Sequence, residues 1–227
     1  MVIVRDFDRP SKEVISELSE YSTADIHEAL GKTNAMAPDI GPISGEETVC
    51  GPACTVQVPP GDNMMVHAGV DYAQKGDILV VATASDRAAV WGELSTLNAQ
   101  KQGLAGFVSD GNVRDSAWLA NNEFPVFAPT ISQAGAVKET PGSVNVPVAV
   151  GGVVVSPGDI LSGDSDGITV VPRENASEIL EATKAKADQE DYLRRQIHEG
   201  ESLYELLNLD KKIAEHDVQI VDSVNEG

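Results

Sequence analysis

Two carboxylates and one guanidinium stand where they could serve a single chemical site: Glu93, and the adjacent pair Arg114 and Asp115. A glycine at position 92 ends a short apolar run, and a helical stretch with an acid and a hydroxyl in its first turn follows it. Residues 104–111 form a second apolar run that ends in a turn signal. In such a strand, helix, strand order the ends of neighbouring parallel strands lie side by side, so Glu93 is expected to face Arg114 and Asp115 across a crevice.

These residue types suit the binding of a small 2-keto acid beside a divalent cation. Carboxylate oxygens together with waters are ligands that Mg²⁺ accepts, and a neighbouring Arg114 can grip a carboxylate or keto oxygen with its fork of donors. The backbone N–H groups of Leu94 and Ser95, at a helix start, would complete an anion site. The alternative is that Glu93 and Asp115 are solvated helix-end acids, with Arg114 in a surface ion pair. The spacing alone does not separate these two interpretations.

Several motifs, in one order, resemble a known family. The chain is similar to the class II pyruvate aldolases that act on 4-hydroxy-4-methyl-2-oxoglutarate and 4-carboxy-4-hydroxy-2-oxoadipate, and to their relatives, the regulator of ribonuclease activity A proteins. The similar segments cover most of residues 20–172 and are Ser22-Thr23-Ala24-Asp25-Ile26-His27-Glu28-Ala29-Leu30-Gly31, Gly51-Pro52-Ala53-Cys54-Thr55-Val56, Gly61-Asp62-Asn63, Lys75-Gly76-Asp77-Ile78-Leu79-Val80-Val81, Gly92-Glu93-Leu94, Gly106 to Asp115, and Pro157-Gly158-Asp159 through Ile168.

The resemblance assigns a role to each residue of the candidate site. It implies that Asp115 holds the metal, largely through water, and that Glu93 contacts a metal-bound water. It also implies that Arg114 polarises the 2-keto oxygen of the substrate, while the N–H groups of Leu94 and Ser95 bind its carboxylate. The expected cofactor is Mg²⁺, with Mn²⁺ or another divalent metal as alternatives.

Two departures from the family pattern concern the acids. The best-known aldolases carry aspartate where this chain has Glu93, which is one methylene longer and changes metal distance and substrate choice. The ribonuclease regulators usually lack an acid there and carry one where this chain has Trp118, so the enzyme branch is favoured. The resemblance also implies a glutamate from a neighbouring subunit near the metal. Glu190 is the best match, Glu199 and Glu201 are alternatives, and an ordinary exposed helix acid is equally consistent with the sequence.

The function expected from this resemblance is a metal-dependent lyase that needs no organic cofactor. Cleavage of a 4-hydroxy-2-keto acid between carbons three and four leaves a pyruvate enolate, whose charge the metal and Arg114 would stabilise. Loss of carbon dioxide from oxaloacetate gives the same enolate, so a decarboxylase side activity is expected. No lysine within the motifs suggests an imine route. The alternative function is a non-catalytic ring that binds basic proteins through its acidic surface, as in the ribonuclease-regulating relatives.

Other polar residues have two interpretations each. Asp62 and Asn63, after a glycine, either line the mouth of the pocket or form a turn. His27 and His67, both on expected helices, either serve catalysis or, as is more common, pack or cap those helices. Cys50 and Cys54 lack the second pair that a structural zinc site requires, and we expect them to be buried thiols.

The composition excludes some partners. A formal charge of -20, from 36 acidic against 16 basic residues, argues against nucleic-acid binding because phosphates would be repelled. The acidic residues are scattered along the sequence and not gathered in one tail, which favours a halophilic source. The alternative is an acidic protein from a mesophile. No apolar run approaches the roughly 20 residues that span a bilayer, and the start of the sequence lacks the apolar core of a signal peptide, so a cytoplasmic location is expected.

The chain is expected to be an α/β protein. Valine-rich runs joined by glycine and proline turns alternate with helical stretches up to about residue 172, and the resemblance implies a layered α/β/α fold like the swivelling phosphohistidine domains. Residues 173–227 then become polar and helical, with a break at Gly200 and a narrow apolar stripe. We therefore predict a catalytic domain over 1–172 and a helical extension over 173–227 that packs on a neighbouring subunit, in the trimer or hexamer that the resemblance implies.

Overall fold

The computed structural model describes residues 1–84, 87–216, 218–221 and 223. Contacts within the chain divide it into two compact units, Met1–Thr183 and Lys184–Gly227. The first unit contains every strand of the described chain, and the second is built from helices. The predicted α/β class is confirmed.

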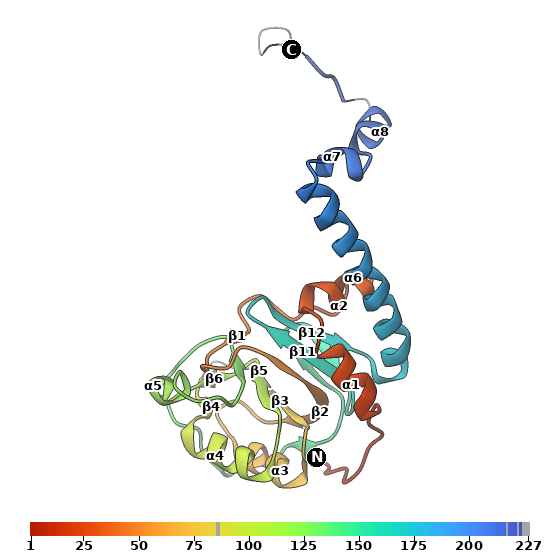
Figure 1. The fold of residues 1–227 in the computed structure, drawn as a ribbon. Coiled ribbons are helices and arrows are strands. Elements are labelled where there is room, and N and C mark those ends of the chain that lie inside the picture. Colours follow the sequence, from red (N-terminus) through yellow and green to blue (C-terminus); the bar gives the residue numbers. More distant parts are fainter. Residues whose placement is uncertain (85–86, 217, 222, 224–227) are drawn as a thin grey trace. The chain divides into compact units, whose positions relative to one another are not determined.

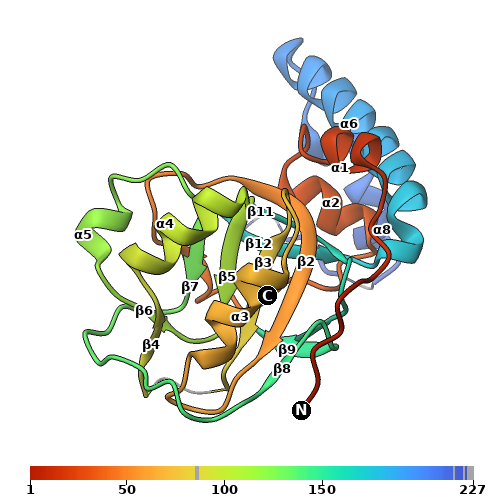
Figure 2. The same ribbon diagram turned by 90° about the horizontal axis from the view of Figure 1, so that it is seen from below.

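One large sheet forms the frame of the first unit (Figures 1 and 2). Its strand order is β1-β7-β5-β3-β2-β11-β12, with β8 paired to β2. Pairing is parallel from β7 through β5 and β3 to β2, and antiparallel at β1, β11, β12 and β8. The strands are β1 (Gly41–Pro42), β2 (Val49–Gln57), β3 (Ile78–Ala82), β5 (Gly106–Ser109), β7 (Val126–Ala128), β8 (Ser143–Val144), β11 (Ile160–Asp164) and β12 (Gly167–Val171).

Two apolar clusters lie on opposite faces of this sheet. Because side chains alternate along a strand, Leu79 and Val81 of β3 join one cluster, while Ile78 and Val80 join the other. The first cluster lies under α3 (Met64–Tyr72) and α4 (Glu93–Gln102). The second is enclosed by the curled sheet, whose terminal strands β1 and β12 approach each other, so the sheet is a nearly closed barrel. Its interior is rich in valine and isoleucine, as the sequence runs indicate.

Two short helices lie near the N-terminus. They are α1 (Lys12–Leu18) and α2 (Thr23–Ala29). The hydroxyl of Ser22 accepts a hydrogen bond from the N–H of Asp25, so Ser22 is the N-cap of α2. Both helices pack with the start of α6 (Ala176–His198) over the strands β11 and β12, and they bury Leu18, Ile26 and Leu180.

Two short ribbons stand apart from the large sheet. Strand β4 (Ala89–Trp91) pairs in parallel with β6 (Asn112–Val113), and β9 (Val148–Val150) forms a hairpin with β10 (Val153–Val155). The valine-rich run at 144–150 is divided between β8 and β9, because Asn145 has a positive φ of 57° and Pro147 cannot donate to a ladder.

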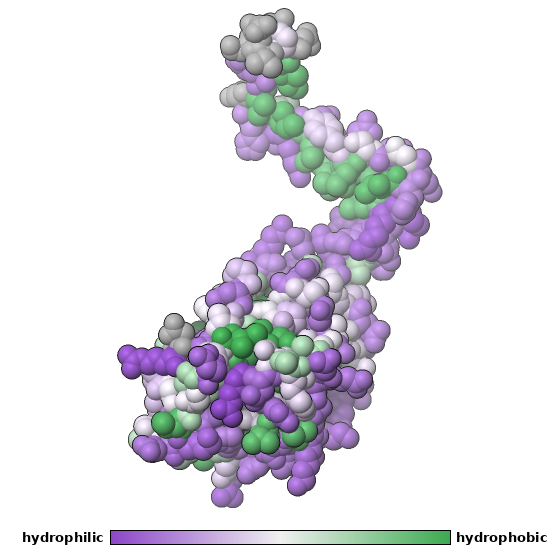
Figure 3. Space-filling view, turned by 90° about the vertical axis from the view of Figure 1, so that its left-hand side faces the viewer, coloured by the Kyte–Doolittle hydropathy of each residue, from purple (hydrophilic) through white to green (hydrophobic). Residues whose placement is uncertain are grey.

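The second unit is helical, as expected after about residue 173. It contains the end of α6, then α7 (Leu203–Leu206) and α8 (Leu209–Ala214). The break at Gly200 is confirmed by its φ of 104°, which favours glycine. Hydrophobic residues form a stripe along these helices (Figure 3), and several are exposed: Tyr192, Ile197, Leu203, Tyr204 and Leu207. The packing of this extension on a neighbouring subunit stays a prediction.

No helix among the described residues is both long enough and apolar enough to cross a membrane. Both cysteines are free thiols, as expected. Cys54 is buried and Cys50 is partly buried, and burial raises the pKa of each thiol to about 12.

Candidate active site

Gly92 brings the start of α4 close to the end of β6. It is the N-cap of α4, and a Cβ placed there would lie 2.5 Å from Oδ2 of Asp115 and 3.0 Å from Cγ of Arg114. A side chain at position 92 would therefore displace Asp115 or Arg114. This lack of space favours glycine, whereas the backbone does not, because the φ of 177° is an ordinary extended value. The approach lets the N–H of Glu93 donate to Oδ2 of Asp115 over 3.0 Å. Glu93 and Asp115 are therefore in direct contact through this bond.

The strand that delivers Arg114 differs from the expected one. The run at 104–111 becomes β5 of the large sheet, whereas the neighbour of β4 is β6, only two residues long. The N–H of Arg114 donates to the carbonyl of Trp91 over 3.0 Å and extends this pairing. Asp115 then takes a left-handed conformation with φ 61° and ψ 36°, which starts α5 (Ser116–Leu119). Nε of Arg114 lies 3.5 Å from Oδ2 of Asp115.

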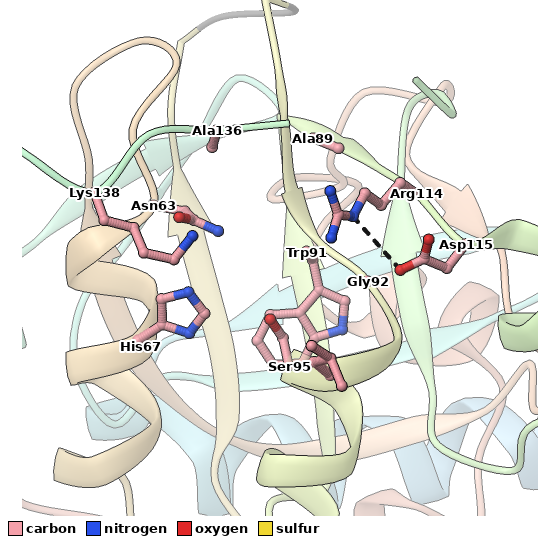
Figure 4. A pocket seen from close by; sticks show the side chains of 11 residues that line it. Asn63, His67, Ala89, Trp91, Gly92, Ser95, Arg114, Asp115, Ala136 and Lys138 are labelled. Atoms are coloured by element: carbon pink, nitrogen blue, oxygen red, sulfur yellow. Dashed lines mark ion pairs between the residues drawn. The ribbon is translucent and has the colours of Figure 1, made fainter. Parts of the chain in front are cut away.

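A cavity of about 130 Å³ lies between the start of α3, the start of α4 and the Arg114–Asp115 pair. Figure 4 shows Arg114 and Asp115 on one side of it and three polar side chains, Asn63, His67 and Lys138, on the other. A more open hollow of about 590 Å³ adjoins Arg114 and Asp115 on the α5 side. The full lining of the smaller cavity is Asn63, His67, Ala89, Trp91, Gly92, Leu94, Ser95, Arg114, Asp115, Ala136 and Lys138.

Two polar atoms on the cavity wall lack a protein partner. Oδ1 of Asn63 and Nε2 of His67 are shielded from solvent and have no hydrogen bond within the described chain. The amide of Asn63 is fixed by donation from Nδ2 to the carbonyl of Val90 over 3.1 Å. Buried polar groups without partners are costly, so these two atoms are suited to a ligand that carries a hydrogen-bonding group.

The surroundings of His67 favour its neutral form. Burial is the main cause that lowers its pKa, the positive charge of Lys138 adds to this, and Asp71 opposes it. A neutral imidazole can accept or donate at Nε2 according to its tautomer. The cavity therefore offers a neutral hydrogen-bonding pair, Asn63 and His67, beside the ammonium of Lys138.

Trp91 forms the floor between the two sides of the cavity. Its ring stacks on Phe107 with centroids 4.1 Å apart. Its Nε1 donates to Oγ1 of Thr96 over 2.8 Å, and that hydroxyl donates to the carbonyl of Gly92 over 3.1 Å. The indole therefore fixes the first turn of α4, on which Leu94 and Ser95 lie.

The structure brings together four of the residues singled out in the sequence: Leu94, Ser95, Arg114 and Asp115 all line the cavity. The carboxylate of Glu93 is not part of that lining, although its backbone bonds to Asp115. The roles of all these residues stay predictions, and so does that of Glu190.

Glu190 lies on α6 in the second unit. Its carboxylate pairs along the helix with Arg194 at 3.0 Å and with Lys186 at 4.0 Å. These contacts resemble ordinary helix-surface pairs.

Asn63 lines the cavity, which is one of its two interpretations from the sequence, and His67, for which catalysis and packing were both considered, lines it as well. Their spacing of four on a helix places them on one face. The rest of this side of the cavity was not predicted. Lys138 and Trp91 were not singled out. Lys138 lies on an irregular segment, where no periodicity signals its position.

The donor set around Asp115 fits a hydrated divalent cation with few protein ligands. Oδ2 of Asp115 already accepts from Glu93, its side chain is 36% exposed, and the cavity rim can admit water. Among the described residues no three His, Cys, Asp or Glu side chains form a metal-binding group. A hard cation that keeps several waters, such as Mg²⁺, is the kind that one or two carboxylates can hold.

Comparisons with known proteins identify the family of this chain. A family model described as RraA-like, Aldolase/RraA, matches residues 23–170. A protein of Halalkalibacterium halodurans, named provisionally as a 4-hydroxy-4-methyl-2-oxoglutarate aldolase, is 34% identical over 189 residues, which cover 83% of this chain and 90% of that protein. The solved structure of an uncharacterised protein from Pseudomonas syringae pv. tomato has a TM-score of 0.80 at 26% identity and covers 88% of this chain and 95% of its own.

A further solved structure comes from the other branch. Streptomyces coelicolor RraAS2, described as an unusual member of the RNase ES inhibitor RraA protein family, has a TM-score of 0.74 at 29% identity, covering 83% of this chain and 99% of its own. The description of the matching family model names both aldolases and RraA proteins. This chain belongs to the RraA-like family of aldolases and RraA proteins.

Proposed function

We propose that this protein is a divalent-metal-dependent carbon–carbon lyase that cleaves a 4-hydroxy-2-keto acid to pyruvate and a second carbonyl product. The observation that carries the proposal is the position of Arg114 and Asp115 beside the start of α4 on the rim of one cavity. The name of the similar protein from Halalkalibacterium halodurans supports the aldolase class.

The pyruvyl end of the substrate would lie against α4 and Arg114. The first N–H groups of a helix have no partner in a preceding turn, so those of Leu94 and Ser95 can bind the substrate carboxylate. Arg114 would donate to the 2-keto oxygen, on which negative charge develops. Leu94, whose side chain is 75% exposed, lies at the entrance to the cavity.

The distal end of the substrate would lie against the opposite wall. Oδ1 of Asn63 can accept a hydrogen bond from a hydroxyl, and Nε2 of His67 can serve as a second partner. The ammonium of Lys138 would face a distal carboxylate. These groups favour a substrate with an acid at each end.

The reaction is a retro-aldol cleavage. The 4-hydroxyl loses its proton, the bond between carbons three and four breaks, and its electron pair passes through carbon three onto the 2-keto oxygen as an enolate. Glu93 would receive the proton through an intervening water, and Arg114 would stabilise the enolate until carbon three is protonated to give pyruvate. A divalent cation held by Asp115 would add Lewis-acid stabilisation of the same negative charge when bound. Oxaloacetate decarboxylation would use the same groups.

The test is pyruvate release from 4-hydroxy-4-methyl-2-oxoglutarate and from oxaloacetate in high salt, with Mg²⁺ or with EDTA. Arg114→Lys keeps the charge but loses the fork, and Asp115→Asn keeps the shape but loses the charge. Each should lower kcat by about 100-fold or more. Arg5→Ala, an exposed site outside the cavity, is the matched control and should retain full turnover. Turnover that persists in EDTA, or in both site variants, would contradict the proposal.

A second candidate is a non-catalytic ring that binds a basic protein. It is supported by the likeness to Streptomyces coelicolor RraAS2 and by the net charge of -20. Binding through charge would weaken steeply with salt and would not need Asp115. Failure of both keto acids to react, together with salt-sensitive binding of a basic protein that Asp115→Asn leaves intact, would favour this candidate.

A further inference from the structure

Asp62 is a buried carboxylate that lies beside the cavity but does not line it. It is 2% exposed, and the cavity lining does not include it. Two polar residues that line the cavity are close to Asp62 in sequence. Asn63 follows it directly, and His67 lies one helical turn further along α3. Asp62 therefore cannot contact a substrate in the cavity, and any effect of its charge on the site must pass through the groups that it binds.

Its two oxygens bind two different parts of the chain. Oδ1 accepts from the N–H of Met64 over 2.8 Å, at the start of α3. Oδ2 accepts from the N–H groups of Glu139 over 2.8 Å and Thr140 over 2.7 Å. One carboxylate thus joins the helix that carries Asn63 and His67 to the segment that carries Lys138.

The segment 134–140, which we call the strap, depends on few anchors. At one end the N–H of Ala89 donates to the carbonyl of Ala134 over 2.7 Å, and a Cβ on Gly135 would lie 3.3 Å from Nη1 of Arg114. At the other end Val137 exchanges backbone hydrogen bonds with residues 61 and 63. Most strap side chains are exposed, so little apolar burial holds the strap in place. Asp62 supplies the last two backbone bonds, directly after Lys138.

We propose that Asp62 is a positioning residue that sets the distance between Lys138 on the strap and Asn63 and His67 on α3, and thereby fixes how the distal carboxylate of the substrate is held. The inference rests on the proposed function and deepens it. Asp62 acts through backbone N–H groups and touches no reacting atom. A carboxylate suits the place because it accepts only, and all three neighbouring groups are donors.

The charge of Asp62 is also maintained in the folded protein. Burial tends to raise its pKa, but donation from the N–H groups of Met64, Glu139 and Thr140 and the charge of Lys138 outweigh this, so the pKa is lowered overall. The lysine that Asp62 positions therefore also helps to keep it ionised.

The experiment combines hydrogen exchange with kinetics. Asp62→Asn replaces one acceptor oxygen with a donor, so at least one of the three N–H groups loses its partner. Amide exchange of residues 137–140 should become about tenfold faster, and KM for 4-hydroxy-4-methyl-2-oxoglutarate should rise about tenfold with a smaller change in kcat. Asp62→Glu keeps the charge and should restore part of the protection if Asp62→Asn folds poorly.

Asp159→Asn is the matched control. Asp159 is 5% exposed and also accepts backbone N–H bonds, from Ser156 over 2.7 Å and Arg173 over 3.1 Å, but it lies outside the cavity lining. This variant should leave both exchange at 137–140 and KM unchanged. In a Lys138→Gln background, Asp62→Asn should raise KM little further, because the two residues act in series.

The outcomes separate this proposal from the proposed function. Unchanged exchange at 137–140 in Asp62→Asn overturns the positioning role, whatever the kinetics. Faster exchange with an unchanged KM, or fully additive effects with Lys138→Gln, overturns it as well. If the unmodified protein cleaves neither keto acid, the lyase proposal fails, while the exchange measurement alone still decides whether Asp62 holds the strap against α3.

Discussion

The backbone N–H of Glu93 and the Oδ2 atom of Asp115 lie 3.0 Å apart in a hydrogen bond. This bond joins the first residue of α4 to the residue that starts α5, and it uses a carboxylate oxygen that also lies 3.5 Å from Nε of Arg114. The helix start and the ionic pair are therefore one unit. A change in either should move the other.

Gly92→Ala tests this unit. The new Cβ would lie 2.5 Å from Oδ2 of Asp115, so the carboxylate must move away from its bond to Glu93. We expect a loss of about 1–3 kcal/mol in the free energy of unfolding, and a fall of about 100-fold in kcat/KM for pyruvate release. Gly41→Ala is the control, because a Cβ at that position meets nothing within 4 Å, and it should behave as the unmodified protein. Equal activity in the two variants would show that the approach at Gly92 is not required.

Thr96→Val should show how much the hydroxyl of Thr96 contributes to stability, apart from the space that its side chain fills. The valine fills the same space but leaves Nε1 of Trp91 buried without an acceptor. An unpaired buried donor costs about 1–3 kcal/mol, so urea denaturation should show a loss of that size. Thr96→Ser keeps the hydroxyl and should lose clearly less. A stability equal to that of the unmodified protein in Thr96→Val would contradict the role assigned to this bond.

The pH dependence of stability should carry a contribution from His67. The pKa of His67 in the folded state lies below the ordinary value of 6.5, chiefly through burial. At a pH between the folded-state pKa and 6.5, the unfolded chain therefore binds a proton at His67 that the folded chain does not. Stability should therefore fall as the pH drops from about 6.5 to the folded-state pKa. The measurement is the free energy of unfolding between about pH 8 and pH 5, with NMR titration of the imidazole. His67→Gln should flatten this fall, and an unchanged pH dependence in this variant would contradict the prediction.

Subunit mixing can test the predicted role of Glu190. If Glu190 completes the site of a neighbouring subunit, Glu190→Gln and Arg114→Ala should each be inactive alone. Mixed oligomers refolded from both should regain activity, because some sites receive a native Arg114 from one chain and a native Glu190 from the next. Glu199→Gln and Glu201→Gln provide the comparison for the alternative positions. Full activity of Glu190→Gln alone would remove Glu190 from the site.

Residues with local signals were predictable from the sequence. Gly92 followed by Glu93 marks a helix start through its own chemistry, so this boundary was located. Buried valine-rich runs such as 78–82 identify themselves as strands. The alternation of such strands with helical stretches predicted the α/β class.

Residues positioned by distant contacts were not predictable in this way. Strand β6 is two residues long, too short for any periodicity, and it exists because β4 offers a partner. Lys138 reaches the cavity because Asp62, far away in sequence, accepts the N–H groups that follow it. No sequence pattern near Lys138 indicates the contact between this segment and Asp62.

The separation of the β4–β6 ribbon from the large sheet has a consequence for how such proteins can diversify. The ribbon carries Arg114 at its end and contributes Trp91, whereas the valine-lined barrel contributes no side chain to the cavity. Substitutions inside the barrel therefore act on the stability of the scaffold, while the strap and the helix starts supply the groups that would meet a ligand. A scaffold divided in this way allows catalytic and non-catalytic descendants to share one architecture.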